Sequence, residues 1–455
     1  MKTAAVICEL NPFHNGHARI FRKLREEYGA DRVIAIMSGN YVQRGEPAVF
    51  DKYVRARMAL VGDGDVGYAD LVLELPVVFA TSSAHEFAAA GVRLAAATGV
   101  VDMLGFGIEP PATLGTLGEL AQRMDEASSM QEASAEDAAP EDASADGAAS
   151  EIAASKDCGA SSRRLRELLA SGMTYPAALS EAYGIEGLTP NNILAVEYLR
   201  ALQALKAEEA AAGRSCSRIT PVAITRTGDD YNASEVSNTD YTSASALRTE
   251  LYAEKAFTYS AVPAALHPLY RELIEGRQVL HPDALSLLLE SRILAAAHNL
   301  PHVNPLSCYL DVSREIADRL IRHADRPMTF TERVADTKTR QYTYSRVSRA
   351  LLHIAVGITD EQSEELKWQG YVNHIRILGF RREASDLLHA LQRSASVPVV
   401  TKPADHKDLL EGSIYMDQIY YAAQAQCRRY GCPGEAADTS ARSIRSEFER
   451  SPLIV

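Results

Sequence analysis

The 455-residue sequence predicts an α/β protein, with a doubly wound parallel sheet near the N-terminus and a mainly helical domain behind it. Its expected strands are nearly continuous apolar runs, which are typical of strands buried on both faces of a parallel sheet. Amphipathic helical stretches separate these runs, as βαβ crossovers require. Beyond about residue 255 long helical patterns dominate and strand signals weaken, which predicts a separate helical domain.

The first expected strand is the run TAAVICEL, which ends at the turn-forming pair Asn11–Pro12. A helix follows from Gly16 to Tyr28, because Ile20, Phe21 and Leu24 recur at helical spacing. The same patterns predict strands at 32–39, 70–76, 101–107 and 220–226, and helices at 51–62, 84–97 and 191–205. Beyond these, DALSLLLESRILAAA is a clear helical run of the C-terminal region.

An acidic insertion interrupts this pattern. Residues 127–160 are almost wholly Ala, Ser, Glu and Asp, with no apolar stripe that could dock a helix, so we expect a disordered segment. Eight acidic residues and one Lys between Glu132 and Asp157 supply −7 of the net charge of −13. The expected domains are therefore 1–126 with 161–254, the insertion 127–160, and the helical region 255–455.

Composition excludes several classes of protein. The sequence has no apolar stretch of eighteen residues, so we expect no membrane span. The short N-terminal apolar run lacks a small-residue cleavage site, so we expect no signal peptide. The six cysteines have no CxxC spacing, which argues against a zinc knuckle or a disulfide framework and favours a cytoplasmic location. We predict no metal site on the chain and no stable protein partner.

The segment Asn11–His17, NPFHNGH, has the strongest functional signal. It follows the first strand and opens the first helix, at the edge where doubly wound sheets bind ligands. A helix N-terminus offers unpaired N–H groups and a positive dipole end, and Gly16 would let the backbone approach a phosphate closely. His14 and His17 could both donate to one phosphate and stabilise charge in a transition state. Two ordinary loop histidines are the alternative.

Several motifs in one order resemble a known family. HxGH after a first strand is the signature of the nucleotidyltransferase superfamily that includes class I aminoacyl-tRNA synthetases. The segments ELNPFHNGH, MSGNYVQRGEPAVFDKYVRARMAL, DLVLELP, LGFGIE, PNNILAVEYLRAL and SASALR resemble the tRNA(Met) cytidine acetate ligases. Weaker likeness continues through QYTYSRVSRALLHI and HIRILGF. The acidic insertion and the residues Cys8 to Leu10 depart from the family pattern.

The resemblance implies a Rossmann-like nucleotidyltransferase fold and ATP-dependent acetylation of the N4 amine of the wobble cytidine of elongator tRNA(Met). Acetate would be activated as acetyl-AMP, with Mg²⁺ as a charge neutraliser. His14 and His17 would be catalytic. ATP would be bound by Ile7, Glu9, Asn11, Phe13, Asn15, Gly16, Gly107, Asn191 or Asn192, Arg226, Ser243, Ser245 and Arg248. A substrate-covering loop would contain Asn40, Gln43, Arg44 and Glu46.

Each of these motifs also has a structural interpretation. Arg44 could bind a carboxylate bidentately, or it could pair with Glu46 in a solvated loop. Gly107 could simply be a turn glycine. One of the adjacent residues Asn191 and Asn192 could cap a helix, and we favour Asn191 for ATP. SASALR could be a capped helix start with a surface Arg rather than a phosphate-binding motif.

Basic residues interleaved with Tyr342 and Tyr344 are candidates for tRNA contacts, because they could bind phosphates beside stacked bases. They are Lys338, Arg340, Arg346, Arg349, Arg376, Arg381 and Arg382. A charge-rich solvated face is the alternative. Two other functions remain open: an adenylyltransferase of cofactor biosynthesis that acts on a small phosphorylated substrate, and a non-catalytic protein that binds nucleotide or RNA.

Overall fold

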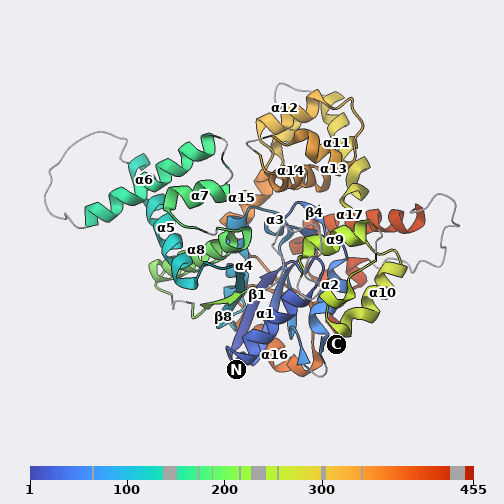
Figure 1. The fold of residues 1–455 in the computed structure, drawn as a ribbon. Helices are drawn as coiled ribbons and strands as arrows, with labels where there is room; N and C mark the ends of the chain where they lie inside the picture. Colours follow the sequence, from blue (N-terminus) through green and yellow to red (C-terminus); the bar gives the residue numbers. More distant parts are fainter. Residues whose placement is uncertain are drawn as a thin grey trace.

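The computed structural model describes residues 1–63, 66–136, 151–171, 173, 175–186, 188–214, 217–226, 242–253, 256–298, 304–339, 342–430 and 446–455. Within these ranges one sheet of eight strands forms the centre of the molecule (Figure 1). Its order is β11 (Val399–Val400), β10 (Ile375–Phe380), β7 (Leu71–Leu75), β2 (Arg32–Ser38), β1 (Thr3–Cys8), β8 (Met103–Ile108) and β9 (Thr220–Thr225), with β12 (Leu453–Ile454) also on β10.

The five strands from β7 to β9 are parallel, and chain order reverses between β1 and β8. This is the doubly wound arrangement that the sequence predicts. Alternate residues of β1 belong to different buried cores: Ala5 and Ile7 to one, Ala4 and Val6 to the other. Because both faces of the strand are buried, every residue of β1 can be apolar.

Helices cover the two faces of the sheet. On one face α1 (Asn15–Glu26) and α2 (Lys52–Leu60) bury apolar side chains in the same core as Val6. On the other face α3 (Val77–Ala80), α4 (Ala84–Ala97) and α8 (Pro190–Ala211) share the core of Ile7. The carboxyl ends of the parallel strands lie between these two layers.

A helical extension contains α5 (Leu114–Glu136), α6 (Glu151–Ala170) and α7 (Tyr175–Tyr183), at the left of Figure 1. Residues 127–136 and 151–160, which we expected to be disordered, are therefore helical. Composition misled here because Ala and Glu favour helix even without an apolar stripe. The remainder of the expected insertion, residues 137–150, lies outside the described residues.

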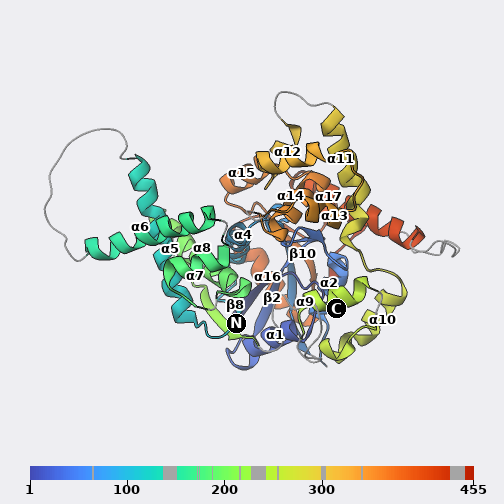
Figure 2. The same cartoon turned by 45° about the horizontal axis from the view of Figure 1, so that its top comes forward.

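The C-terminal region is mainly helical, as predicted. Its helices α11 to α14 lie above the sheet in Figures 1 and 2, at the end opposite the N-terminus. The helices are α10 (His267–Glu275), α11 (Ser286–His298), α12 (Arg314–Arg322), α13 (Phe330–Thr337), α14 (Tyr344–Val356), α15 (Asp360–Trp368), α16 (Ser385–Ser394) and α17 (Lys407–Tyr430). Helix α9 (Ala244–Tyr252) comes just before this region.

The sheet does not respect the domain boundary expected at residue 254. Strand β10 pairs antiparallel with β7, and β11 and β12 pair with β10, so the C-terminal region extends the N-terminal sheet. The chain between residue 255 and the C-terminus is thus joined to the N-terminal half through backbone hydrogen bonds. Among the described residues, no helix combines the length and apolar character that a membrane span needs.

Candidate active site

The two motif histidines lie where β1 gives way to α1. His14 is the N-cap residue of α1, and its Nδ1 accepts a hydrogen bond from the Gly16 N–H at 3.0 Å. The Nδ1 of His17 accepts from the His14 N–H at 3.2 Å. Because each Nδ1 is an acceptor, the proton of each neutral ring is assigned to Nε2. The two ring centroids are 3.9 Å apart, so the two donors lie side by side.

Both imidazoles are neutral at pH 7. Burial, followed by the charges of His17, Arg226 and Arg248, holds the pKa of His14 well below its ordinary value. Burial and the charge of Arg226 lower the pKa of His17 to about 3. Loss of water disfavours a cation that already faces other cations. The rings therefore act as neutral N–H donors in an electropositive site.

Both rings line one cavity, which we call the inner cavity, at the carboxyl ends of β1 and β8 and directly after β9. This is the point where chain order reverses in the sheet, the usual ligand position in this architecture. Most residues singled out from the sequence line it: Ile7, Glu9, Asn11, His14, His17, Gln43, Arg44, Gly107, Asn191, Arg226, Ser243, Ser245 and Arg248.

Two of the lining arginines come from separate elements. Arg226 follows β9, and its Nε lies 3.4 Å from Glu109 Oε1. Arg44 comes from the loop after β2, and its Nη1 donates to Ser245 Oγ at 3.4 Å. Two guanidinium groups from different elements make the cavity attractive to an anion.

Helix α9 supplies a third arginine and a helix N-terminus. Ser243 is the N-cap residue, and its Oγ accepts from the Ala246 N–H at 3.0 Å. Arg248 is buried; it donates to the Asn11 carbonyl at 2.7 Å and its Nε lies 3.3 Å from Glu46 Oε1. The capped helix start is therefore present, and it faces the cavity. The alternative of a surface Arg is wrong, because Arg248 is buried and links α9 to the motif loop.

The structure separates the adjacent asparagines. Asn191 lines the inner cavity and donates from Nδ2 to Glu109 Oε1 at 2.5 Å. Asn192 is buried and brackets the Glu109 backbone, accepting from its N–H at 2.8 Å and donating to its carbonyl at 2.9 Å. Thr189 is the N-cap of α8, so neither Asn is. Asn192 thus joins α8 to the end of β8 and does not line the cavity.

Both expected glycines make room for side chains. A Cβ on Gly16 would lie 2.7 Å from His14 Cε1, and one on Gly107 would lie 3.1 Å from Arg226 Cγ. Glycine at these two positions allows the His14 ring to fold back onto the helix start and the Arg226 side chain to cross β8. The close approach of a ligand phosphate or adenosine to these two glycines stays a prediction.

Phe13 and Asn15 support the motif without lining the cavity. Phe13 is buried, with its ring centroid 5.6 Å from that of His17 and 5.0 Å from that of Tyr68. Asn15 donates from Nδ2 to the Ser260 carbonyl at 2.8 Å. These contacts hold the motif loop in place, and the expected contacts of Phe13 and Asn15 with ATP stay predictions.

The loop that we expect to cover the substrate is a short hairpin of β3 (Tyr41–Val42) and β4 (Glu46–Pro47). The Gln43 N–H donates to Glu9 Oε1 at 2.8 Å, which joins the hairpin turn to the end of β1. Burial raises the pKa of Glu9, partly offset by that hydrogen bond and by Arg248. Gln43 and Arg44 reach the inner cavity, whereas Glu46 lines a second cavity next to it.

Helix α17 holds the base of this hairpin. Asn40 is buried, donating to Asp417 Oδ1 at 2.8 Å and accepting from the Lys52 N–H at 2.8 Å. The Tyr420 hydroxyl donates to the Ala48 carbonyl at 2.9 Å. Asn40 is therefore a structural residue rather than a substrate contact.

Helix α14 holds the tip. The Ser348 hydroxyl donates to the Gly45 carbonyl at 2.8 Å. Gly45 has φ +80°, and a Cβ there would lie 2.2 Å from the Arg349 backbone nitrogen. Only glycine meets both demands, the left-handed backbone and the contact with a helix backbone. Two helices of the C-terminal region thus fix the loop that carries Arg44.

The predicted tRNA contact of Arg376 conflicts with the burial of this side chain. It is buried on β10, in a cluster with Lys52, Glu74, Asp417 and Glu447. Its guanidinium donates to Glu447, and Lys52 Nζ lies 2.5 Å from Asp417 Oδ2. Arg376 compensates buried carboxylates, as a buried charge must be compensated, and cannot reach RNA here.

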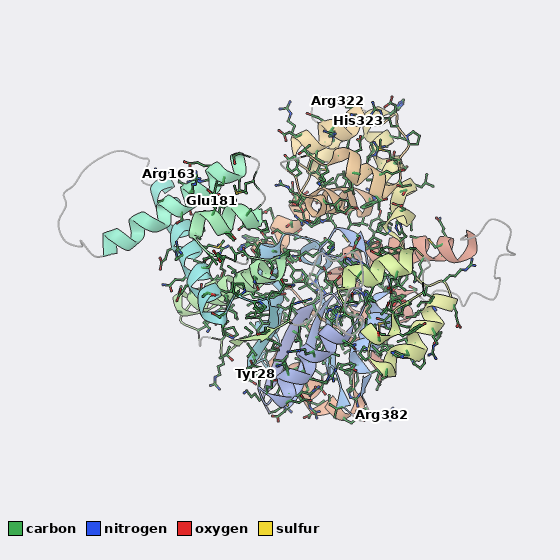
Figure 3. All side chains as sticks on the ribbon, in the orientation of Figure 1. Tyr28, Arg163, Glu181, Arg322, His323 and Arg382 are labelled. Atoms are coloured by element: carbon green, nitrogen blue, oxygen red, sulfur yellow. The ribbon has the colours of Figure 1, made fainter. Side chains whose placement is uncertain are left out.

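Two neighbouring candidates lie away from the cavity. Arg381 donates to the Leu60 carbonyl at 3.0 Å, and its side chain is 12% exposed. Arg382 is exposed at the lower end of the molecule in Figure 3, opposite the helices α11 to α14. These two residues therefore belong to a different surface from the site. Arg340 lies outside the described residues.

The remaining basic candidates lie near the cavities or on the helices above them. Arg349 lines the second cavity and pairs with Asp311 at 2.8 Å. Arg346 is exposed on α14, with its guanidinium carbon 4.9 Å from the centroid of the Tyr342 ring. Lys338 is exposed after α13. These three residues remain compatible with an RNA contact.

The inner cavity has an apolar wall that sequence reasoning missed. Leu194 and Tyr198 line it from α8, together with Phe87 from α4 and Phe106 from β8. Leu194 and Tyr198 are three and seven residues beyond Asn191, so helical spacing placed them on the same face. Phe87 carries no such signal, because it reaches the cavity from another helix.

Comparison with known proteins shows the family to which the chain belongs. Residues 1–431 match the family described as HIGH Nucleotidyl Transferase. The tRNA(Met) cytidine acetate ligase of Acetivibrio thermocellus is 31% identical over 421 residues, which cover 89% of each chain. That of Caldanaerobacter subterraneus subsp. tengcongensis is 30% identical, covering 94% of this chain and 96% of the relative.

Solved structures agree. Thermotoga maritima TmcAL is 26% identical, with a TM-score of 0.72 over the whole of both chains. A second crystal structure of TmcAL, bound with alpha-thio ATP, matches equally well. The chain therefore belongs to the HIGH nucleotidyltransferases, which the doubly wound sheet and the His14/His17 pair define. Within them it belongs to the tRNA(Met) cytidine acetate ligase family.

Proposed function

We propose that the protein uses ATP and acetate to acetylate the N4 amine of the wobble cytidine of elongator tRNA(Met), through acetyl-AMP. One observation carries the proposal: His14 and His17 present two neutral donors in an arginine-lined cavity beside a helix start. Membership in the ligase family supports the substrates, and the related TmcAL has been crystallised with an ATP analogue.

ATP binds in the inner cavity with its phosphates toward α1 and α9. The apolar wall of Phe106, Leu194 and Tyr198 accommodates the adenine, because aromatic and aliphatic side chains offer stacking surface. Helix N-termini and arginines hold the phosphates. The side chains of Ser243, Ser245 and Arg248 lie beside the leaving pyrophosphate.

In the first step an acetate oxygen attacks the α-phosphorus, the bond to the bridging oxygen breaks, and pyrophosphate leaves. The Nε2–H donors of His14 and His17 stabilise the added negative charge on the phosphate oxygens. Arg44 orients the acetate carboxylate. In the second step the cytidine N4 attacks the acetyl carbonyl, and AMP leaves with the electron pair of the C–O bond.

In the part of the chain that the structure describes, no three or more His, Cys, Asp or Glu side chains are grouped so that they could hold a metal ion. We expect Mg²⁺ to enter as part of the ATP substrate, held by its phosphate oxygens. A tRNA substrate is consistent with a cytoplasmic location, and Lys338, Arg346 and Arg349 are the proposed RNA contacts.

The experiment is mass spectrometry of tRNA nucleosides after incubation of the protein with total tRNA, ATP, Mg²⁺ and acetate. We expect N4-acetylcytidine, and acetyl-CoA should not replace ATP plus acetate. Labelled pyrophosphate should exchange into ATP when acetate is present, with tRNA added in case activation needs it. An adenylyltransferase of cofactor biosynthesis would exchange only with its own nucleotide product. The proposal would be refuted if neither pyrophosphate exchange nor N4-acetylcytidine were detected with all components present.

A further inference from the structure

A second cavity, which we call the outer cavity, adjoins the inner one. Its volume is about 570 Å³, within the range of small-ligand pockets. Arg44, Asn191 and Arg248 line both cavities, so the outer cavity opens onto the place where the activated acetyl group would form. Glu46 and Tyr252 line the outer cavity but not the inner one.

Two buried polar atoms in this cavity lack hydrogen-bond partners among the described residues: Glu46 Oε1 and the Tyr252 hydroxyl. Glu46 Oε1 lies 3.3 Å from Arg248 Nε, and its side chain keeps 16% exposure. Glu46 Oε1 therefore has an ion pair but no hydrogen bond, and the Tyr252 hydroxyl has no hydrogen bond. Because buried polar atoms without hydrogen bonds are costly, two of them beside one cavity point to a polar ligand. The ion pair with Arg248 accounts for the position of the Glu46 carboxylate, but it gives no hydrogen-bond partner to the Tyr252 hydroxyl.

The two groups offer complementary chemistry. Burial and then the Glu46 carboxylate raise the pKa of Tyr252, so its hydroxyl stays protonated and can donate. Burial and the same carboxylate raise the pKa of Tyr344, and all three residues line the same cavity. Tyr344 lines the cavity and is 47% exposed, so it presents aromatic surface at the entrance. The cavity thus combines an acceptor, a donor and a stacking surface.

Cytosine fits this combination. It presents an exocyclic N4 amine, which a carboxylate accepts, beside acceptor atoms that a hydroxyl can reach. Uracil presents an oxygen in place of the amine, and a carboxylate facing that oxygen would be repelled. An aromatic side chain can stack on a base that is splayed out of a single-stranded loop.

We propose that the outer cavity is the cytosine subsite, with Glu46 as the acceptor of the N4 proton, Tyr252 as a donor to the ring and Tyr344 as the stacking partner. This inference rests on the proposed function. During transfer the N4 lone pair forms the C–N bond, the C–O bond to AMP breaks, and one N4 proton passes to a Glu46 oxygen and then to water. Glu46 thereby selects cytidine and removes its proton.

The test uses Glu46→Gln and Tyr252→Phe in the full-length protein, with Glu364→Gln as the control. Glu364 lies on α15 with 72% of its side chain exposed, so its loss should change neither reaction. For each variant, acetate-dependent pyrophosphate exchange and tRNA acetylation are measured in parallel, and thermal unfolding reports folding. Tyr252→Phe removes a hydroxyl without a partner, so we expect no loss of stability.

We expect acetylation by Glu46→Gln to fall about 10–100-fold more than exchange does, as for loss of a charge-assisted hydrogen bond. Tyr252→Phe should raise the KM for tRNA more than it lowers kcat. Equal losses of exchange and acetylation, or unchanged acetylation by both variants, would overturn the subsite. If the wild-type protein shows neither reaction, the proposed function itself has failed.

Discussion

Replacing His17 with Ala isolates the catalytic contribution of one neutral imidazole. The substitution removes an Nε2–H donor from the inner cavity, and placed donors of this kind contribute about 10²–10³ in turnover, or roughly 3–4 kcal/mol. It also removes the acceptor of the His14 N–H, whose hydrogen bond at 3.2 Å is worth about 1 kcal/mol of stability. Turnover should therefore fall far more than stability.

The assay pairs single-turnover formation of acetyl-AMP with equilibrium binding of ATP and with thermal unfolding. We expect binding of ATP to change little, because the donor matters mainly in the transition state. His389→Ala serves as the control, since His389 is exposed on α16. His17→Gln, whose amide can donate, should retain more activity than His17→Ala. Equal losses of binding and turnover would indicate an ordinary nucleotide contact, and unchanged turnover would refute a catalytic role.

Three further perturbations test the loop, the pH response and the acidic segment. Gly45→Ala should lower turnover at least about tenfold, because a left-handed Ala costs roughly 1–2 kcal/mol and its Cβ would meet the Arg349 backbone at 2.2 Å; normal steady-state turnover would contradict this. Burial lowers the pKa of His353 to about 4, below the unfolded value of 6.5, so its stabilising effect is complete above pH 6.5 and falls by about 2 kcal/mol between pH 7 and 5. Denaturant unfolding at both pH values should show that the free energy of unfolding of His353→Gln drops by that much less than that of the wild-type protein. An identical drop in both proteins would rule out His353 as the group responsible. Replacing residues 137–150 with a short Gly/Ser linker should leave the melting temperature and ATP binding unchanged, since the segment has no hydrophobic side chain larger than those of Ala and Pro. A large loss of folded protein in a calorimetric scan would show that the segment is structural.

Local sequence patterns were sufficient to predict the elements that carry His14 and His17. The buried strand β1, the turn after it and the start of α1 follow from apolar runs and helix-start signals within a few residues. His14 and His17 are three residues apart at that helix start, so the sequence placed them together. Spacing could not show that each Nδ1 accepts a backbone N–H, because that depends on the side-chain conformation.

The choice between Asn191 and Asn192 illustrates the limit. Both residues precede the same apolar helix, and propensity does not distinguish them. The distinction arises because Glu109, at the end of another strand, offers its backbone to Asn192 and its carboxylate to Asn191. Only the packing of α8 against β8 brings that residue into range.

Arg376 shows why basic residues were the least predictable part. From the sequence it is one of several arginines near tyrosines, and a surface role is the simple expectation. In the fold it is buried beside Glu447 and Glu74, which are 71 and 302 positions away in the chain. Likewise α14 and α17 reach the Asn40–Ala48 loop over about three hundred residues or more. Apolar periodicity determines which elements form, because it acts within each segment. Tertiary structure decides which residues pair with a buried charge and which helices hold the Asn40–Ala48 loop. A buried charge needs an opposite charge or a hydrogen bond beside it, and that partner can come from any distance along the chain.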